Sequence, residues 1–302
     1  MRVPITGLPI TGAPITGACG KDEDAPKGVR FVALRNPALY RESHAGRADT
    51  RRGDGGGMTA VLVRVLERFG PLPEPERRSV ESVPLDGERV EADRDLLHEG
   101  VPSSHCPVLL EGFACRYTLL EDGRRQILAF YVPGDPCDLA GLMLGTPSHS
   151  TCTLTHSRVA LVPHTALLDR AKRHPLLNEA LWRAALADAA GSDEWVINVG
   201  RRTARQRTAS LLCELVLRLH AAGPARGPDY ALPLTKVELA DALGLTPVHV
   251  GRTLQALREH GLAEFAGGVL TVHDWPGLQH AAGFDPGRPH RPGPAGRGRP
   301  AP

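Results

Sequence analysis

Residues 234–254 read LTKVELADALGLTPVHVGRTL, and this stretch predicts two short helices joined by a tight turn. Thr235 and Glu238 fit a capping box at the start of the first helix, where each side chain can satisfy a backbone donor. Gly244 permits the left-handed conformation that a tight turn between helices requires. Thr246 then caps the second helix and is followed at once by proline, which is favoured at the first helical position. The stretch therefore predicts a helix-turn-helix.

The second helix of this motif has an apolar and a polar face. Val250, Leu254 and Leu257 recur at i, i+4 and i+7 and are expected to be buried. Four residues are expected to lie off that stripe and to reach a major groove: His249, Arg252, Thr253 and Gln255. Two short extended runs, 264–266 and 269–272, follow around Gly267-Gly268 and predict a two-stranded wing.

The charge near this motif is locally basic. Between Arg201 and His260, nine Lys or Arg residues face five Asp or Glu residues, a surplus of four positive charges. Such a surplus favours contacts with DNA phosphates. We therefore predict DNA binding, against the alternative of a regulatory module whose helix-turn-helix contacts only protein.

The composition of the whole chain bounds its class. Its 302 residues, of which 41% are hydrophobic, suffice for two domains, and the net charge of +2 indicates no partner by itself. The six cysteines lack paired spacing, which is typical of a reduced cytoplasmic protein rather than a disulfide scaffold. No apolar run approaches the roughly 20 residues that span a bilayer, and no secretory signal is evident, so we expect a soluble cytoplasmic protein.

A β-domain is predicted ahead of the helix-turn-helix. Alternating apolar residues from Phe113 to Val132, with the turn Glu121-Asp122-Gly123 between them, predict a β-hairpin. Further strands are expected at 150–155 and 158–162. Short strands with regular turns indicate a jelly-roll.

Helices are predicted on both sides of these strands. They cover 58–69, 165–172, 176–199 and 203–220. The alanine-rich stripe of the third helix favours close helix packing, at a dimer seam or against its own β-domain.

The two ends are expected to be disordered. Residues 4–18 repeat the pentapeptide Pro-Ile-Thr-Gly-Leu/Ala, and proline and glycine in each copy oppose a helix. Residues 1–57 are therefore predicted to form a disordered extension, with Met58 as a candidate translation start, and 283–302 a flexible tail.

The stretch 234–254 resembles the helix-turn-helix of Crp/Fnr-type (CAP-like) transcription regulators, and the similarity extends over roughly 80–275. The resemblance implies an α+β chain with a double-stranded β-helix sensor domain of the cyclic-nucleotide-binding type at 58–177. A dimerisation helix at 178–199 and a winged helix-turn-helix at 200–282 would follow. It also implies a homodimer that reads an inverted repeat in double-stranded DNA with one recognition helix per half-site, and RNA polymerase as a further partner.

The recognition helix departs from the family. Pro247 and Val248 stand where the family often has Arg and Glu, whereas Arg252 is retained. Arg252 is therefore the main candidate for bidentate contact with guanine, and Val248 for contact with a thymine methyl. Thr246 completes the set of expected DNA contacts, and the operator is expected to differ from the family's usual one.

The predicted sensor domain also departs from the family, at the positions that hold a nucleotide. The family holds a nucleotide with a Gly-Glu and an Arg-Ser/Thr pair, and the matching residues here are Asp138-Leu139 and His149-Ser150. A leucine cannot accept from a ribose hydroxyl, and a histidine replaces an arginine poorly. The expected pocket for an unidentified effector comprises Gly134, Asp135, Asp138, Leu139, His149 and Ser150. We expect no cyclic nucleotide as cofactor, and a cyclic-AMP-responsive regulator is the alternative.

Cysteines and histidines of the β-domain raise a second alternative, a redox- or metal-sensing regulator. They are His98, His105, Cys106, Cys115, Cys137, His149, Cys152 and His156. Their spacing is not that of a metal site, so we expect plain structural roles and no metal. An iron–sulfur sensor would need a cysteine cluster ahead of the β-domain, where only Cys19 lies. A cupin enzyme would need a His-x-His pair, which is missing, so we expect no enzyme.

Overall fold

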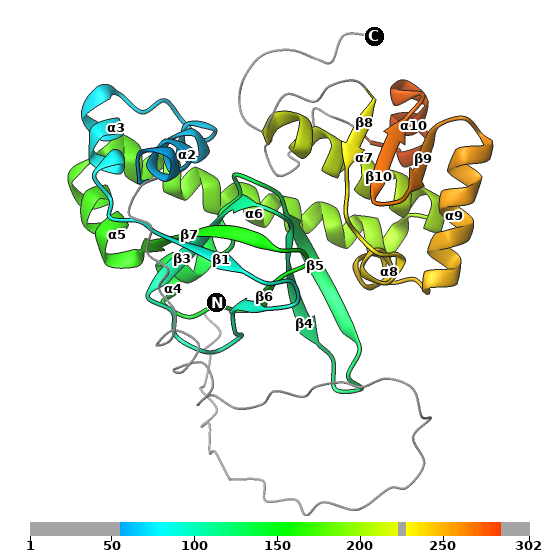
Figure 1. The fold of residues 1–302 in the computed structure, drawn as a ribbon, viewed down its shortest axis with the longest axis horizontal. Coiled ribbons are helices and arrows are strands. Elements are labelled where there is room, and N and C mark those ends of the chain that lie inside the picture. Colours follow the sequence, from blue (N-terminus) through cyan, green and yellow to red (C-terminus); the bar gives the residue numbers. More distant parts are fainter. Residues whose placement is uncertain (1–54, 223–227, 285–302) are drawn as a thin grey trace, which may run out of the picture. The chain divides into compact units, whose positions relative to one another are not determined.

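The structure is a computed structural model that describes residues 55–222 and 228–284, all within one compact unit, Thr50–Pro302 (Figure 1). The predicted N-terminal extension and C-terminal tail lie almost entirely outside these residues. The first helix begins at Gly55, so the expectation of disorder up to residue 57 is wrong for its last three residues. Phe284, in the predicted tail, is buried against the C-terminal helices.

The β-domain contains two antiparallel sheets. One has the strand order β1-β7-β3 and the other β2-β6-β4-β5. Their bounds are β1 Asp86–Val90, β2 Asp95–Leu97, β3 His105–Glu111, β4 Ala114–Leu119, β5 Arg125–Tyr131, β6 Ser150–Thr153 and β7 Ser157–Pro163. The predicted hairpin is β4–β5, and its turn contains Gly123 at φ +80°, where a side chain would be strained. The strands predicted near 150 and 158 are confirmed as β6 and β7.

Helices flank this domain and lead out of it. They are α2 Gly55–Glu67, α3 Glu74–Glu81, α4 Leu139–Leu144, α5 His164–Arg173, α6 Pro175–Arg201 and α7 Ala204–Ala222. The long α6 confirms the predicted dimerisation helix as a helix and extends it at both ends. None of the helices in the described residues is long and apolar enough to cross a membrane.

The C-terminal part is a winged helix-turn-helix. Its elements are β8 Asp229–Ala231, α8 Lys236–Leu243, α9 Pro247–Glu259, β9 Ala263–Ala266, β10 Val269–Val272 and α10 Trp275–Ala282. The wing was predicted with two strands, but β8 pairs with β10 and makes a third. The sequence pattern does not predict β8 because this strand has only three residues. Its partner strand also lies about 40 residues away, too far for a local pattern to indicate the pairing.

Three apolar clusters hold these parts together. Leu109 and Val159 of one sheet meet Ala114 and Tyr131 of the other, so the two sheets share a core. A second cluster packs α2, α3, α5 and α6 against β3 and β7. The third joins the four-stranded sheet to α7, α8 and α9, and this cluster fixes the helix-turn-helix on the β-domain.

Candidate nucleic-acid interface and sensor pocket

Backbone caps position the two helices of the helix-turn-helix. The predicted capping box is present: Glu238 N donates to Thr235 Oγ1 over 3.2 Å, and Thr235 N donates to Glu238 Oε2 over 2.5 Å. Gly244 follows α8 at φ +61°, so the chain turns without a side-chain clash. Thr246 Oγ1 then accepts from His249 N over 3.2 Å. These local bonds set where α9 begins.

The helix α9 is amphipathic, as predicted. Val250, Leu254 and Leu257 are buried, whereas His249 and Arg252 are exposed. Thr246, Val248 and Gln255 are exposed as well, and Val248 shows 66% of its surface. Gln255 Nε2 donates to Glu259 Oε1 over 3.0 Å, along the helix surface.

Thr253 does not lie on the exposed face of α9, contrary to the prediction. It is buried, with only 6% of its surface exposed. Its Oγ1 donates to Val250 O over 2.9 Å and lies 3.0 Å from Thr208 Oγ1 on α7. The helical period could have shown this, because residue 253 lies three after Val250 and four before Leu257, on the apolar stripe. Thr253 therefore joins α9 to α7.

Arg252 remains available on the exposed face. It forms no ion pair with any residue that the structure describes. Lys236, which no sequence pattern indicated, adds a second cation beside α9. Its Nζ lies 3.9 Å from the position that a Cβ on Gly251 would occupy. The exposed face of α9 therefore combines a free guanidinium, an ammonium group and the apolar Val248.

Some of the basic residues counted between Arg201 and His260 form contacts inside the protein. Arg207 Nη1 donates to Leu243 O over 3.1 Å, at the end of α8. Arg202 pairs with Glu194 at 2.5 Å, and Arg218 pairs with Asp135 and Glu214. These three arginines stabilise the packing around the helix-turn-helix. The count of basic residues therefore overstates the positive charge that is available to DNA phosphates.

The six residues predicted to form an effector pocket are divided between two places. Gly134 and Asp135 lie in the turn after β5, where Asp135 accepts from Val132 N over 2.8 Å and pairs with Arg68 at 3.5 Å and with Arg218. The carboxylate of Asp135 therefore links the turn after β5 to α7. It has a structural role, as the partner of two largely buried arginines.

The other four residues of the predicted effector pocket lie around α4 and β6. Asp138 caps α4, accepting from Gly141 N over 2.8 Å, and Leu139 packs into the helical cluster. His149 Nδ1 lies 3.0 Å from Ser148 Oγ, and Ser150 Oγ accepts from Glu99 N over 3.1 Å. Asp138 and His149 share a charged neighbourhood with Arg116 and Asp188, described below.

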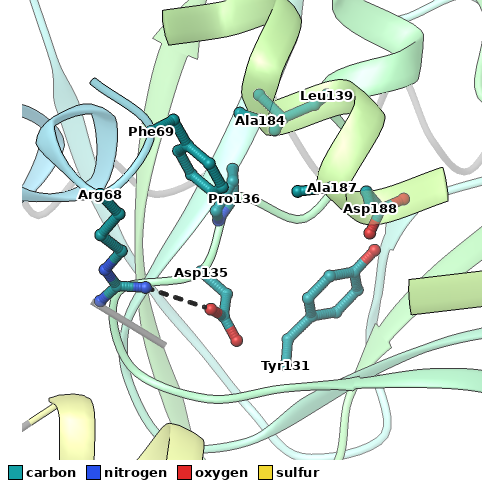
Figure 2. A pocket seen from close by; sticks show the side chains of 9 residues that line it. All are labelled: Arg68, Phe69, Tyr131, Asp135, Pro136, Leu139, Ala184, Ala187 and Asp188. Atoms are coloured by element: carbon teal, nitrogen blue, oxygen red, sulfur yellow. Dashed lines mark ion pairs between the residues drawn. The ribbon is translucent and has the colours of Figure 1, made fainter. Parts of the chain in front are cut away.

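A small cavity lies between the turn after β5 and α6 (Figure 2). Its volume is about 30 Å³. Nine residues line it: Arg68, Phe69, Tyr131, Asp135, Pro136, Leu139, Ala184, Ala187 and Asp188. Only Asp135 and Leu139 belong to the predicted set. Burial lowers the pKa of Arg68 here, and Asp135 opposes that shift.

The residues at the expected nucleotide anchors do not suit a cyclic nucleotide. Leu139 offers no acceptor for a ribose hydroxyl. Burial lowers the pKa of His149, so this imidazole is a weaker cation than the arginine that the family places there.

The cysteines do not form a reactive or metal-binding centre among the described residues. No group of three or more His, Cys, Asp or Glu side chains there could hold a metal ion. Cys115 Sγ lies 3.5 Å from Cys152 Sγ across β4 and β6, and that contact, with burial, raises the pKa of Cys115. Burial raises the pKa of Cys106 to about 12. Neutral, buried thiols are poor nucleophiles and metal ligands.

Comparison with known proteins agrees with both parts of the fold. The profile of the Crp-like helix-turn-helix domain matches residues 206–281, and that of the cyclic nucleotide-binding domain matches residues 88–174.

Several curated relatives are transcription regulators. The nitrogen fixation regulation protein FixK of Azorhizobium caulinodans is 34% identical over 155 residues, which is 51% of this chain and 61% of that relative. FixK of Bradyrhizobium diazoefficiens is 31% identical over 170 residues, 55% of this chain and 69% of the relative. The solved structure of FixK2 from Bradyrhizobium japonicum is 27% identical, with a TM-score of 0.61, covering 66% of this chain and 98% of that one.

Proposed function

Because the chain belongs to the Crp/Fnr family of DNA-binding transcription regulators, we propose that it binds an inverted-repeat operator as a homodimer. One α9 helix enters the major groove of each half-site. The observation that carries this proposal is the exposed face of α9, where Arg252 has no internal partner among the described residues.

Arg252 reads a guanine in each half-site. An arginine fork donates two hydrogen bonds to guanine O6 and N7, and such a pair discriminates against a wrong base by about 1–3 kcal/mol. Val248 offers only methyl groups, so its contact with a base is apolar, for instance with a thymine methyl. Lys236 strengthens binding through a phosphate and carries no base preference.

The base-reading role is tested by selecting the operator from random DNA and measuring affinity at fixed salt. Arg252→Ala should weaken binding to the selected site by about 1–3 kcal/mol, with little loss on random DNA. Arg124→Ala, in the β4–β5 turn where Arg124 pairs with Asp122, is the matched control and should bind like the wild type. An equal loss on both DNAs would make Arg252 a phosphate contact. A wild type without sequence preference would refute the proposed function.

The dimer forms through one face of α6. Its large exposed apolar side chains include Trp182 (53% exposed), Leu186 (65%), Val196 (72%) and Ile197 (41%), here called the α6 stripe. Their spacing of 0, 4, 14 and 15 residues places them on one side of a helix with 3.6 residues per turn. Covering this stripe with a second copy removes apolar surface from water.

Sedimentation equilibrium tests the dimer. Leu186→Glu should shift the protein toward monomer and weaken operator binding, because two half-sites are then no longer engaged together. Leu176→Glu is the control, since Leu176 is exposed on α6 but lies off the stripe. A Leu186→Glu variant that stays dimeric contradicts the assignment.

A protein that reads chromosomal DNA of a bacterium works in the cytoplasm, and RNA polymerase is the proposed further partner of the bound dimer. Transcription in vitro from a promoter carrying the selected operator tests the second point. A transcript level that is unchanged by the protein contradicts it.

A further inference from the structure

We propose that an internal ion pair between Arg116 and Asp188 replaces a bound nucleotide as the link between the β-domain and α6, so that operator binding needs no cyclic nucleotide. The inference rests on the proposed function. Arg116 Nη1 donates to Asp188 Oδ2 over 2.7 Å, and Arg116 Nη2 donates to Ser192 Oγ over 3.2 Å. One guanidinium on β4 thus holds two successive turns of α6.

The pair lies beside the positions where the family anchors its nucleotide. Asp138 and His149 are both within electrostatic range of Arg116 and Asp188. Burial raises the pKa of Asp138, an effect that Arg116 and His149 oppose and Asp188 reinforces. Burial and Arg116 lower the pKa of His149, while Glu99, Asp138 and Asp188 oppose that shift.

The charges here disfavour a phosphate. Asp138 and Asp188 are carboxyl groups, and the guanidinium of Arg116 already spans Asp188 and Ser192. An incoming phosphate would lie near carboxylates and would have to compete with Asp188 for the arginine. Both partners of the pair are largely buried, with side chains 17% and 20% exposed, so water screens their attraction only weakly.

The space beside Asp188 is also small. The cavity against this part of α6 has about 30 Å³ and is lined by Leu139, Ala184 and Asp188 among others. A nucleotide phosphate that bound Arg116 would first have to displace Asp188 from the guanidinium. A ligand that must first break a native contact is bound more weakly by that cost.

The link reaches the DNA-binding part through the second half of α6. Trp195 Nε1 donates to Glu214 Oε2 on α7 over 2.9 Å, and Glu194 pairs with Arg202 at the junction of the two helices. Thr208 of α7 in turn contacts Thr253 of α9. Arg116 therefore holds a helix whose far end supports the recognition helix.

Operator affinity without ligand is the first test. The protein is unfolded in guanidinium, dialysed and refolded to remove any bound nucleotide, and binding to the selected operator is measured by fluorescence anisotropy. We expect the same affinity with and without cyclic AMP or cyclic GMP, and no heat of binding when either is titrated into the free protein. Stoichiometric nucleotide binding, or operator binding only after nucleotide is added, overturns the proposal. Failure to prefer any DNA sequence refutes the proposed function instead.

Variants of the pair are the second test. Arg116→Ala and Asp188→Asn should each weaken operator binding about tenfold, a typical size for coupling between sites. The exchanged pair Arg116→Asp with Asp188→Arg should recover much of that loss if the charges matter as a pair. Arg183→Ala is the control, because Arg183 forms an exposed pair with Glu179 on the same helix.

Thermal unfolding of each variant separates a lost link from a lost fold. We expect the Asp188→Asn variant to remain folded, since its amide is nearly isosteric with the carboxylate. A folded Asp188→Asn protein that binds the operator as tightly as the wild type overturns the proposal.

Discussion

Replacing Asp135 should destabilise the protein more than any exposed carboxylate. Its carboxylate lies between Arg68 and Arg218, whose side chains are 10% and 4% exposed, and is itself 13% exposed. Removing one partner of a buried ion pair usually costs about 3–5 kcal/mol, because a charge remains without compensation. Arg218 would keep Glu214 and the carbonyl of Phe130. We therefore expect Asp135→Ala to lower the free energy of unfolding by about 3 kcal/mol, the lower end of that range.

The expected loss of stability in Asp135→Ala comes from the other partner of this carboxylate, Arg68. Burial already lowers its pKa, and Asp135 is the charge that opposes this shift, so Asp135→Ala leaves a poorly solvated guanidinium. Asp135→Asn keeps an acceptor oxygen and loses only the charge, so its effect should be smaller than that of alanine. A folded state stabilised by about 5–15 kcal/mol would lose a large fraction of its stability.

Guanidinium unfolding monitored by tryptophan fluorescence measures these differences. Trp195 is a suitable probe, since its ring lies 6.3 Å from that of Phe130, whose carbonyl binds Arg218. Glu74→Ala is the control: it removes an exposed i,i+4 pair with Arg78, worth about 0.3–0.5 kcal/mol. If Asp135→Ala costs no more than Glu74→Ala, Asp135 is not the acceptor that the structure assigns.

Three further perturbations probe other parts of the chain. Burial, and to a smaller extent His105, lowers the pKa of His164 below its ordinary 6.5, so the unfolded chain binds the proton more tightly and stability falls as the pH drops below about 6.5. His164→Phe should make that fall shallower in unfolding curves, and an unchanged slope would contradict it. Cys106 and Cys115 should resist iodoacetamide at pH 8 until the protein is unfolded, as mass spectrometry of their peptides can show; fast native labelling would favour thiol sensing. Thr253→Val should lower stability by about 1 kcal/mol through its lost bond to Thr208 and leave the selected operator sequence unchanged. An altered base preference would return Thr253 to the DNA contacts.

The sequence alone determined the features that depend on neighbours in the chain. The capping box, the turn at Gly244 and the start of α9 rest on hydrogen bonds and backbone angles within a few residues. The β4–β5 hairpin depends on the Asp122-Gly123 turn in the same way. Local patterns of this kind can be read without a fold, and from them the order of β-domain, long helix and winged helix-turn-helix followed.

Only the tertiary structure decided which polar groups meet across long separations. Arg116 and Asp188 lie 72 residues apart, and Arg218 and Asp135 lie 83 apart. No spacing rule connects such positions, because their approach depends on how the sheets and helices pack. For this reason the sequence assigned Asp135 to an effector pocket and Thr253 to DNA, whereas packing made one an acceptor for two buried arginines and the other a buried contact between helices.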